Sequence, residues 1–361
     1  MKSKNTRAQA YIRQLCCLGL AKEALATELL HAVKKAIPSS SNIYMEIDVG
    51  NSSGMIVPEY EICEALAFLA AESRRLVTLP MSQRVLHWYA GHAVFDDPRI
   101  MADDFYAGDF YNLVWRPYDH HHTMQCLVSH HQGRVATLLL GRARAARAFS
   151  ADEKALFARL IPYFRHGLRG RCRDETDYDG AGDAGLFVMD PGGRLVYASD
   201  KARKLLLMAR YPAYPVGSPV SFEAADIPPA LGRLCRNLDG IFQGRAAAPP
   251  VAEHINGRGR FLFRAHWLDP IARDGGGLIG VTVEHQEPAA LQLLRRIGDL
   301  PLSPVQMEVC LMLARNQSQE SIARALDIGL ATARDHIRKI YLKLGVHQRD
   351  ELTRRLRAAQ A

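Results

Sequence analysis

Short helical segments separated by strong capping residues occupy the last sixth of the chain. Residues 302–316 read LSPVQMEVCLMLARN, which places Ser303 at an N-cap and Pro304 at the first helical position. A second helix is expected to begin after Ser318, another good N-cap. The spacing predicts a small all-α unit built from several short helices.

A third helix is predicted from about Leu330 to Leu344. Only four residues, DIGL, separate it from the second helix, which leaves room for a turn and nothing longer. Gly345 ends the third helix as a residue that adopts the left-handed conformation without strain, and Arg349 begins a short basic fourth helix. Two short helices joined by a tight turn form the frame of a helix-turn-helix.

The third helix has one apolar face and one charged face. Its expected inner face comprises Ala333, Ile337, Ile340, Tyr341 and Leu344. Arg334, Asp335 and Arg338 lie away from that stripe, and an arginine fork can donate two hydrogen bonds to guanine O6 and N7. Lys339 and Lys343 are placed to meet phosphates. The competing interpretation is that these cations are simply a solvated helix face.

Residues 302–352 resemble a LuxR-type (FixJ/NarL-like) helix-turn-helix domain. The resemblance rests on landmarks in register without a gap: Leu302-Ser303-Pro304, Glu308-Val309, Ser318, Ile322-Ala323, Leu326, Ile328, Thr332, His336, Ile340, Lys343-Leu344-Gly345-Val346 and Arg349. It implies that Arg334, Asp335 and Arg338 read bases. It also implies backbone contacts by Ser318, Thr332, Lys339, Lys343 and Arg349.

Four positions depart from the family pattern. Asn316 replaces a glycine between the first two helices, and Ser321 replaces a glutamate. Gly329 replaces the hydroxyl cap of the third helix, and Ala333 replaces a valine. Each departure is expected to weaken capping or packing by ~1 kcal/mol at most, which affects affinity and not the fold.

Composition and charge agree with a soluble DNA-binding protein. The chain has 48% hydrophobic and 23% charged residues, which excludes disordered, collagen-like and disulfide-scaffold classes. Its net charge is +8, and residues 301–361 hold 10 Lys/Arg and 6 Asp/Glu, so half of the excess lies there. No signal peptide or membrane span is evident, and seven scattered cysteines fit a reduced, cytoplasmic protein.

The first 173 residues are predicted to form an α+β domain that loosely resembles GAF domains. A helical pattern from Arg7 to Ile37 precedes a predicted strand at 43–49 and a predicted helix at about 59–75. Residues 124–142 predict a β-hairpin turning at 131–133. Ser150 and Glu153 have capping-box spacing and begin an amphipathic helix.

A second α+β domain is predicted over residues 185–287, after a glycine-rich linker at 171–185. Residues 186–198 form a hairpin around a Pro-Gly-Gly turn, and Ser199 caps a helix at 200–210. Two more antiparallel strands are expected at 261–268 and 278–285. This element order resembles PAS domains, and both GAF and PAS domains are sensory modules.

Other patterns favour structural interpretations. Gly180, Gly182 and Gly185 spell a dinucleotide motif, but acidic linker text precedes them and a strand follows, the reverse of a phosphate site. His120, His121, His122, Cys126, His130 and His131 could suggest a metal site, but the histidines are expected to be exposed loop residues and no metal site is expected. Trp88, Asp97-Pro98 and Trp115 faintly echo an acyl-homoserine-lactone pocket, and core aromatics explain them better. No catalytic triad, P-loop or phospho-acceptor pair is found.

The sequence therefore predicts a multidomain protein with two α+β sensory domains, GAF-like at 1–173 and PAS-like at 185–287. A helical linker at 288–300 leads to the all-α four-helix domain at 301–361. In the linker Leu291, Leu294 and Ile297 form part of a dimer seam or pack on the second domain.

We expect a dimeric, cytoplasmic transcription regulator without cofactor or enzymatic activity. Its partners would be double-stranded DNA, a second copy, RNA polymerase and an unidentified small molecule sensed by an N-terminal domain, with no membrane. Two alternatives stay open: a protein-interaction module that docks through the helix-turn-helix, and a sensor whose first domain is an unrecognised enzyme.

Overall fold

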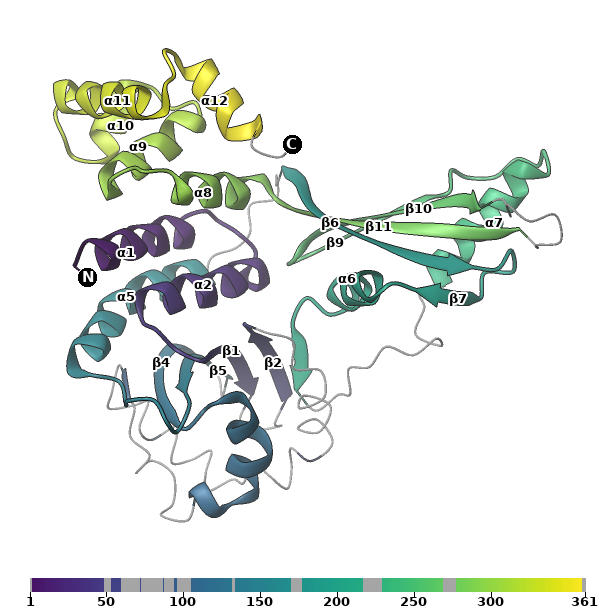
Figure 1. The fold of residues 1–361 in the computed structure, drawn as a ribbon, viewed down its shortest axis with the longest axis horizontal. Coiled ribbons are helices and arrows are strands. Elements are labelled where there is room, and N and C mark those ends of the chain that lie inside the picture. Colours follow the sequence, from purple (N-terminus) through teal and green to yellow (C-terminus); the bar gives the residue numbers. More distant parts are fainter. Residues whose placement is uncertain are drawn as a thin grey trace. The chain divides into compact units, whose positions relative to one another are not determined.

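The computed structural model describes residues 2–48, 53–59, 72, 87, 94–95, 105–131, 134–169, 177–216, 229–268 and 277–358. They form two compact units, each assembled from segments distant in the sequence (Figure 1). Unit 1 comprises residues 1–39, 150–177 and 289–361 and is helical, whereas unit 2 comprises residues 40–149 and 178–288 and holds both β-sheets. None of the described helices combines the length and apolar character needed to cross a bilayer.

The first sheet of unit 2 is antiparallel and six-stranded, in the order β3-β4-β5-β1-β2-β8. Its strands are β1 (Ser41–Asp48), β2 (Ser53–Pro58), β3 (Val94–Phe95), β4 (His122–His131), β5 (Arg134–Arg142) and β8 (Tyr214–Val216). The predicted hairpin is the β4–β5 pair. β5 lies inside the sheet, and all of its residues except Arg134 are buried, which explains its near-continuous apolar run.

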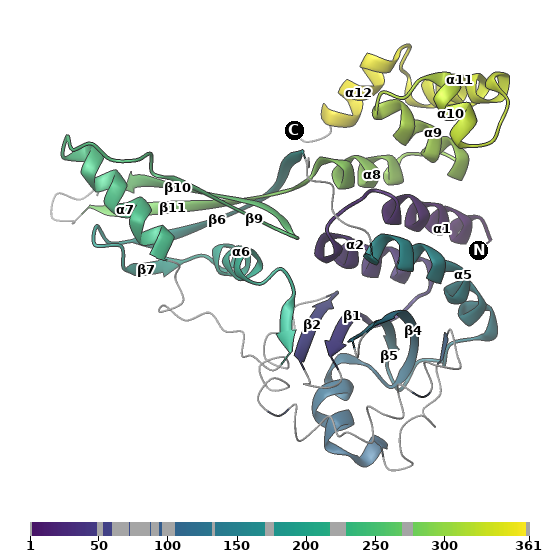
Figure 2. The same cartoon turned by 180° about the vertical axis from the view of Figure 1, so that it is seen from behind.

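The second sheet is antiparallel and five-stranded, in the order β7-β6-β11-β10-β9. It comprises β6 (Tyr178–Met189), β7 (Leu195–Ala198), β9 (Val251–Asn256), β10 (Gly259–Leu268) and β11 (Leu278–Pro288). Helices α6 (Asp200–Arg210) and α7 (Pro229–Phe242) pack on one face of it (Figure 2). Alternate residues Phe261, Phe263 and Ala265 of β10 meet Leu205 and Leu234 there in a closed apolar core.

The predicted linker at 171–185 is wrong at its end, because β6 already begins at Tyr178. Glycine-rich text indicated a loop, but the glycine at 185 allows close packing instead. A Cβ on Gly185 would lie 2.4 Å from the backbone nitrogen of Ala202 in α6. The residues therefore form a strand on which a helix lies unusually close.

Unit 1 begins with two helices where the sequence indicated one helical stretch. They are α1 (Lys2–Cys16) and α2 (Lys22–Ala36), separated by a turn in which Gly19 has φ of 74°. The expected capping box begins α5 (Ala151–Arg169), with Ser150 N donating to Glu153 at 2.8 Å and Glu153 N donating to Ser150 at 3.3 Å. Most of the helix predicted at 59–75 lies outside the described residues.

The remaining helices of unit 1 are α8 (Ala289–Asp299), α9 (Pro304–Ala314), α10 (Gln319–Ala325), α11 (Leu330–Leu344) and α12 (Arg349–Ala358). Ser303 caps α9 in a full capping box with Gln306. On α8, Leu291, Leu294 and Ile297 are buried, and this helix contacts α1, α9 and α12. Helices of the same chain therefore cover these side chains without a second copy.

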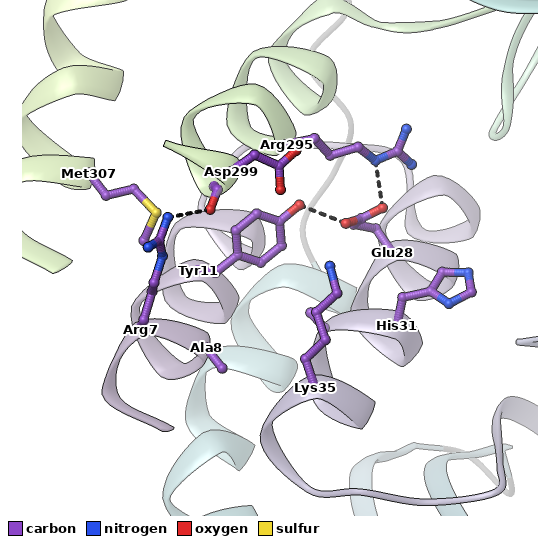
Figure 3. Close-up of a pocket in the computed structure, with 11 residues that line it drawn as sticks. Arg7, Ala8, Tyr11, Glu28, His31, Lys35, Arg295, Asp299 and Met307 are labelled. Atoms are coloured by element: carbon purple, nitrogen blue, oxygen red, sulfur yellow. Dashed lines mark hydrogen bonds and ion pairs between the residues drawn. The ribbon is translucent and has the colours of Figure 1, made fainter. Parts of the chain in front are cut away.

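Polar contacts tie α8 to α1 and α2 (Figure 3). The buried carboxylate of Glu28 on α2, 7% exposed, accepts from the Tyr11 hydroxyl at 2.6 Å and from Arg295 Nε at 2.7 Å. Arg7 donates to the carbonyl oxygens of Gly298 (2.6 Å) and Leu300 at the end of α8. The first helices of the chain and its last helices thus belong to one packed body.

Candidate nucleic-acid interface

Helix α10 begins at a side-chain cap and leads into α11 through a short turn. Ser318 caps α10, with its hydroxyl oxygen accepting from the backbone N–H of Ser321 at 3.1 Å. Asp327, just past the end of α10, has φ of 52°, a left-handed conformation that aspartate tolerates better than most residues. Gly329 precedes α11 and offers no side-chain cap, as its residue type predicted. The start of α11 therefore depends on the backbone conformation of the turn and has no side-chain cap.

Asn316 explains why the glycine usual at this position can be replaced. Its φ is 62°, in the left-handed region that favours glycine but also admits asparagine. Its side-chain oxygen accepts from Arg349 at 2.8 Å, which joins the α9–α10 turn to the start of α12. Asparagine here adds a contact that glycine could not supply.

Helix α11 has the two faces that its sequence predicted. Ala333, Ile337, Ile340 and Leu344 are buried, and Gly345 ends the helix with φ of 61°. Tyr341, also expected on the inner face, is only partly buried, because it lies at the edge of the packed stripe. Arg334 and Arg338 are exposed on the other side, and 81% of the Arg338 side chain is accessible. An exposed arginine stripe opposite a packed face is the arrangement needed to enter a groove.

Asp335 forms ion pairs with two of the cations around it. Its carboxylate accepts from Arg338 at 3.1 Å and from Lys339 at 2.6 Å. The hydrogen bonds from Lys339 and Arg338 hold the pKa of Asp335 below its usual range, so the group is ionised at neutral pH. Asp335 therefore places a negative charge between two positive ones on the outer face of the helix.

Arg334 has a different partner, Gln319 at the first position of α10. Gln319 Oε1 accepts from Arg334 Nε at 3.1 Å. Arg334 also lies near Glu320, the next residue of α10. The pKa of Glu320 is held below its usual range by hydrogen bonds with the Glu320 backbone and Ser318, and by the charge of Arg334. Gln319 does not stand out in the sequence, because no local pattern shows that α10 begins beside Arg334.

The structure separates the predicted backbone-contacting residues into two groups. Thr332 and Lys339 are exposed near the start and middle of α11. Lys343 donates to the Pro301 carbonyl (3.1 Å) and to Gln306 (2.8 Å), and Arg349 donates to the Gln317 carbonyl (2.7 Å). Ser318 is engaged as the cap of α10. These three would have to combine their internal bonds with a phosphate contact.

A groove of about 440 Å³ runs along the same face of the domain. Its lining includes Gln319, Arg334, Arg338, Tyr341, Leu342 and His347. Leu342 is 82% exposed and lies one turn beyond Arg338. An exposed leucine among these cations was not predicted from the sequence pattern.

The histidine cluster of unit 2 corrects one expectation. His120 is a buried residue, not an exposed loop histidine, and burial lowers its pKa to about 4. His121 is half-buried and its Nδ1 lies 2.6 Å from the Tyr111 hydroxyl. Trp115 is only partly buried, with its ring centroid 6.0 Å from that of His120, whereas Trp88 and Asp97-Pro98 lie outside the described residues. Within the described ranges no three His, Cys, Asp or Glu side chains are grouped to hold a metal.

Comparison with known families identifies the C-terminal helices. The model of the bacterial regulatory proteins, luxR family, matches residues 300–356. These residues form a LuxR-type helix-turn-helix domain. The match spans α9, α10 and α11 and most of α12, so Arg334, Asp335 and Arg338 lie within the LuxR-type domain.

No curated relative matches the chain. Among solved structures the chain is similar to the LBD domain of VqsR from Pseudomonas aeruginosa, with 19% identity and a TM-score of 0.34 over 42% of this chain and 92% of that one. It is also similar to the VqmA dimer of Vibrio cholerae, with 16% identity and a TM-score of 0.18 over 49% of this chain and 83% of that one. The phage VqmA–DPO complex has 19% identity and a TM-score of 0.19 over 50% of this chain and 85% of that one. TM-scores below 0.5 do not establish a common fold.

Proposed function

We propose that this chain is a sequence-specific DNA-binding transcription regulator whose helix α11 enters the major groove. The observation that carries the proposal is the exposed pair Arg334 and Arg338, opposite the packed face of α11 in a LuxR-type domain. An α-helix fits the major groove, where each base pair presents a distinct pattern of donors and acceptors. The proposal assigns no catalytic chemistry to the chain.

In this proposal the outer face of α11 divides its contacts by chemistry. Arg334 and Arg338 donate to guanine edges, and Asp335 accepts from the amino group of cytosine. Thr332, Lys339 and Lys343 contact phosphates, together with Ser318 and Arg349 at the neighbouring helix ends. Phosphate contacts set the register and base contacts supply the sequence preference.

The rest of the chain is proposed to sense a small-molecule signal in the cytoplasm and to act as a dimer. The order strand, strand, helix and antiparallel meander in residues 178–288 supports a PAS-like unit, and the six-stranded antiparallel sheet supports a GAF-like one. Two copies would place two α11 helices in major grooves about 34–36 Å apart or a multiple of that. RNA polymerase is the proposed downstream partner.

A second candidate function is supported by Leu342. A large apolar side chain that is 82% exposed, in a groove that Tyr341 and Val346 also line, is what a protein-docking helix presents too. On this alternative the helix-turn-helix domain would bind a protein partner through Leu342 and Tyr341. DNA affinity would then be weak and indifferent to sequence.

Selection from a random duplex library separates the two candidates. The full-length protein is expected to enrich a short motif containing guanine, and Arg334→Ala/Arg338→Ala is expected to abolish the enrichment. Leu342→Gln is the matched variant, because it removes the apolar surface and leaves the charge unchanged. Enrichment by Leu342→Gln but not by the arginine variant supports DNA reading. No enrichment by the wild-type protein would reject it.

A further inference from the structure

We infer that Gln319 is a positioning residue that orients Arg334 as the principal guanine-reading side chain, while Asp335 restrains Arg338. This inference rests on the proposed DNA-binding function and deepens it. It assigns different tasks to two arginines that look equivalent in the sequence. The argument starts from which nitrogen of each guanidinium is already bonded.

Gln319 is held in place by the start of α10. It follows directly after the Ser318 cap, is half-buried and belongs to the first turn of the helix. Its Oε1 accepts from Nε of Arg334, 15 residues later in the chain and on the next helix. A fixed acceptor on one helix therefore limits the rotamers of an arginine on the other.

The bond to Nε leaves the recognition end of Arg334 available. Guanine O6 and N7 are read by two parallel N–H donors of the guanidinium fork. Within the described residues Arg334 forms no other hydrogen bond, so both terminal nitrogens keep their protons for a base. A side chain that is already ordered loses less conformational entropy when it binds.

Arg338 is in the opposite situation. One of its terminal nitrogens donates to the Asp335 carboxylate at 3.1 Å, its side chain is 81% exposed, and among the described residues it has no hydrogen bond to another helix. To pair with guanine through both terminal nitrogens it must give up or share that ion pair. Arg338 can therefore pair with a guanine through both terminal nitrogens only when its ion pair with Asp335 is broken or shared.

The experiment uses the full-length protein and the duplex that the wild type selects. Single-base variants of that duplex are titrated by competition anisotropy, and Arg334→Ala identifies the base pair whose guanine preference it removes. Gln319→Ala is expected to reduce the preference at that same base pair by about threefold to tenfold, the size of one net hydrogen bond. The salt dependence of binding is expected to stay unchanged, because no cation is lost.

Three further variants make the role specific. Gln319→Glu keeps the acceptor, so it is expected to retain the guanine preference while overall affinity falls because of the added negative charge. Gln317→Ala is the matched control, since within the described part of the chain the Gln317 side chain forms no hydrogen bond, and its backbone carbonyl, which accepts from Arg349, is kept. Adding Gln319→Ala to Arg334→Ala is expected to change nothing further, because Gln319 acts through Arg334. Circular dichroism checks that each variant is folded.

Two results would overturn the inference while leaving DNA reading intact. An unchanged guanine preference in Gln319→Ala would show that Arg334 does not need the hydrogen bond to Gln319 to read its base. An equal additional loss in the Arg334→Ala background would show that Gln319 contacts DNA itself. A wild-type protein that selects no motif would instead reject the proposed function on which the inference rests.

Discussion

At the scale of single residues, the outer face of α11 holds one ionised carboxylate among its cations. Asp335 is ionised and bound to Arg338 and Lys339. Replacing it in Asp335→Ala frees two cations and removes a charge that phosphates repel. We expect affinity for non-specific duplex DNA to rise severalfold with a steeper salt dependence, measured by anisotropy on random-sequence DNA. An unchanged affinity would mean that Asp335 lies away from the DNA.

His120 gives unit 2 a predictable response to acid. Its pKa is lowered to about 4 by burial, below the usual 6.5 that the unfolded chain would show. Between these values the unfolded state binds the extra proton, so stability falls as pH decreases from about 6.5 toward 4. The slope approaches about 1 kcal/mol per pH unit. Urea unfolding followed at pH 7 and pH 5 is expected to show this loss, and His120→Leu is expected to reduce it.

At the scale of elements, helix α11 begins without a side-chain cap. Gly329 has φ of −64° and ψ of 148°, values that any residue adopts, and a Cβ there would lie 3.8 Å from Thr332 Oγ1. Gly329→Ser can therefore supply the missing cap and is expected to stabilise the domain by a few tenths of a kcal/mol. Gly329→Ala, which has no acceptor, is expected to destabilise it. Equal urea midpoints for the two variants would contradict this account.

The elements also show what local sequence can and cannot predict. The bounds 330–344 of α11, the caps at Ser303 and Ser318 and the β4–β5 hairpin depend on neighbours in the chain, and the sequence predicted them. The contact of Gln319 with Arg334 depends on how α10 and α11 cross. The pairing of β2 with β8 joins residues about 160 positions apart. Such contacts have no local signature, so they could only be observed.

At the scale of the whole molecule, Glu28 joins three helices of unit 1. Glu28→Ala removes the acceptor of the Tyr11 hydroxyl and one partner of Arg295, and we expect a loss of about 2–3 kcal/mol in the free energy of unfolding. Glu28→Gln keeps an acceptor and is expected to lose less. The half-exposed pair Arg264 and Glu284 in unit 2 supplies the control, because Glu284→Ala should cost about 1 kcal/mol or less. Similar losses of unfolding free energy in Glu28→Ala and Glu284→Ala would show that the buried contact of Glu28 contributes no more than an exposed ion pair.

The central claim, that α11 reads DNA, is tested most directly by anisotropy of the full-length protein on its own upstream DNA across a salt series. Wild type is compared with Arg334→Ala/Arg338→Ala and with Arg354→Ala/Arg355→Ala, which removes two exposed arginines of α12 from the same domain. We predict tight, sequence-selective and salt-dependent binding that the α11 variant loses and the α12 variant keeps with its selectivity intact. Binding that ignores sequence and survives the α11 substitutions would contradict the claim.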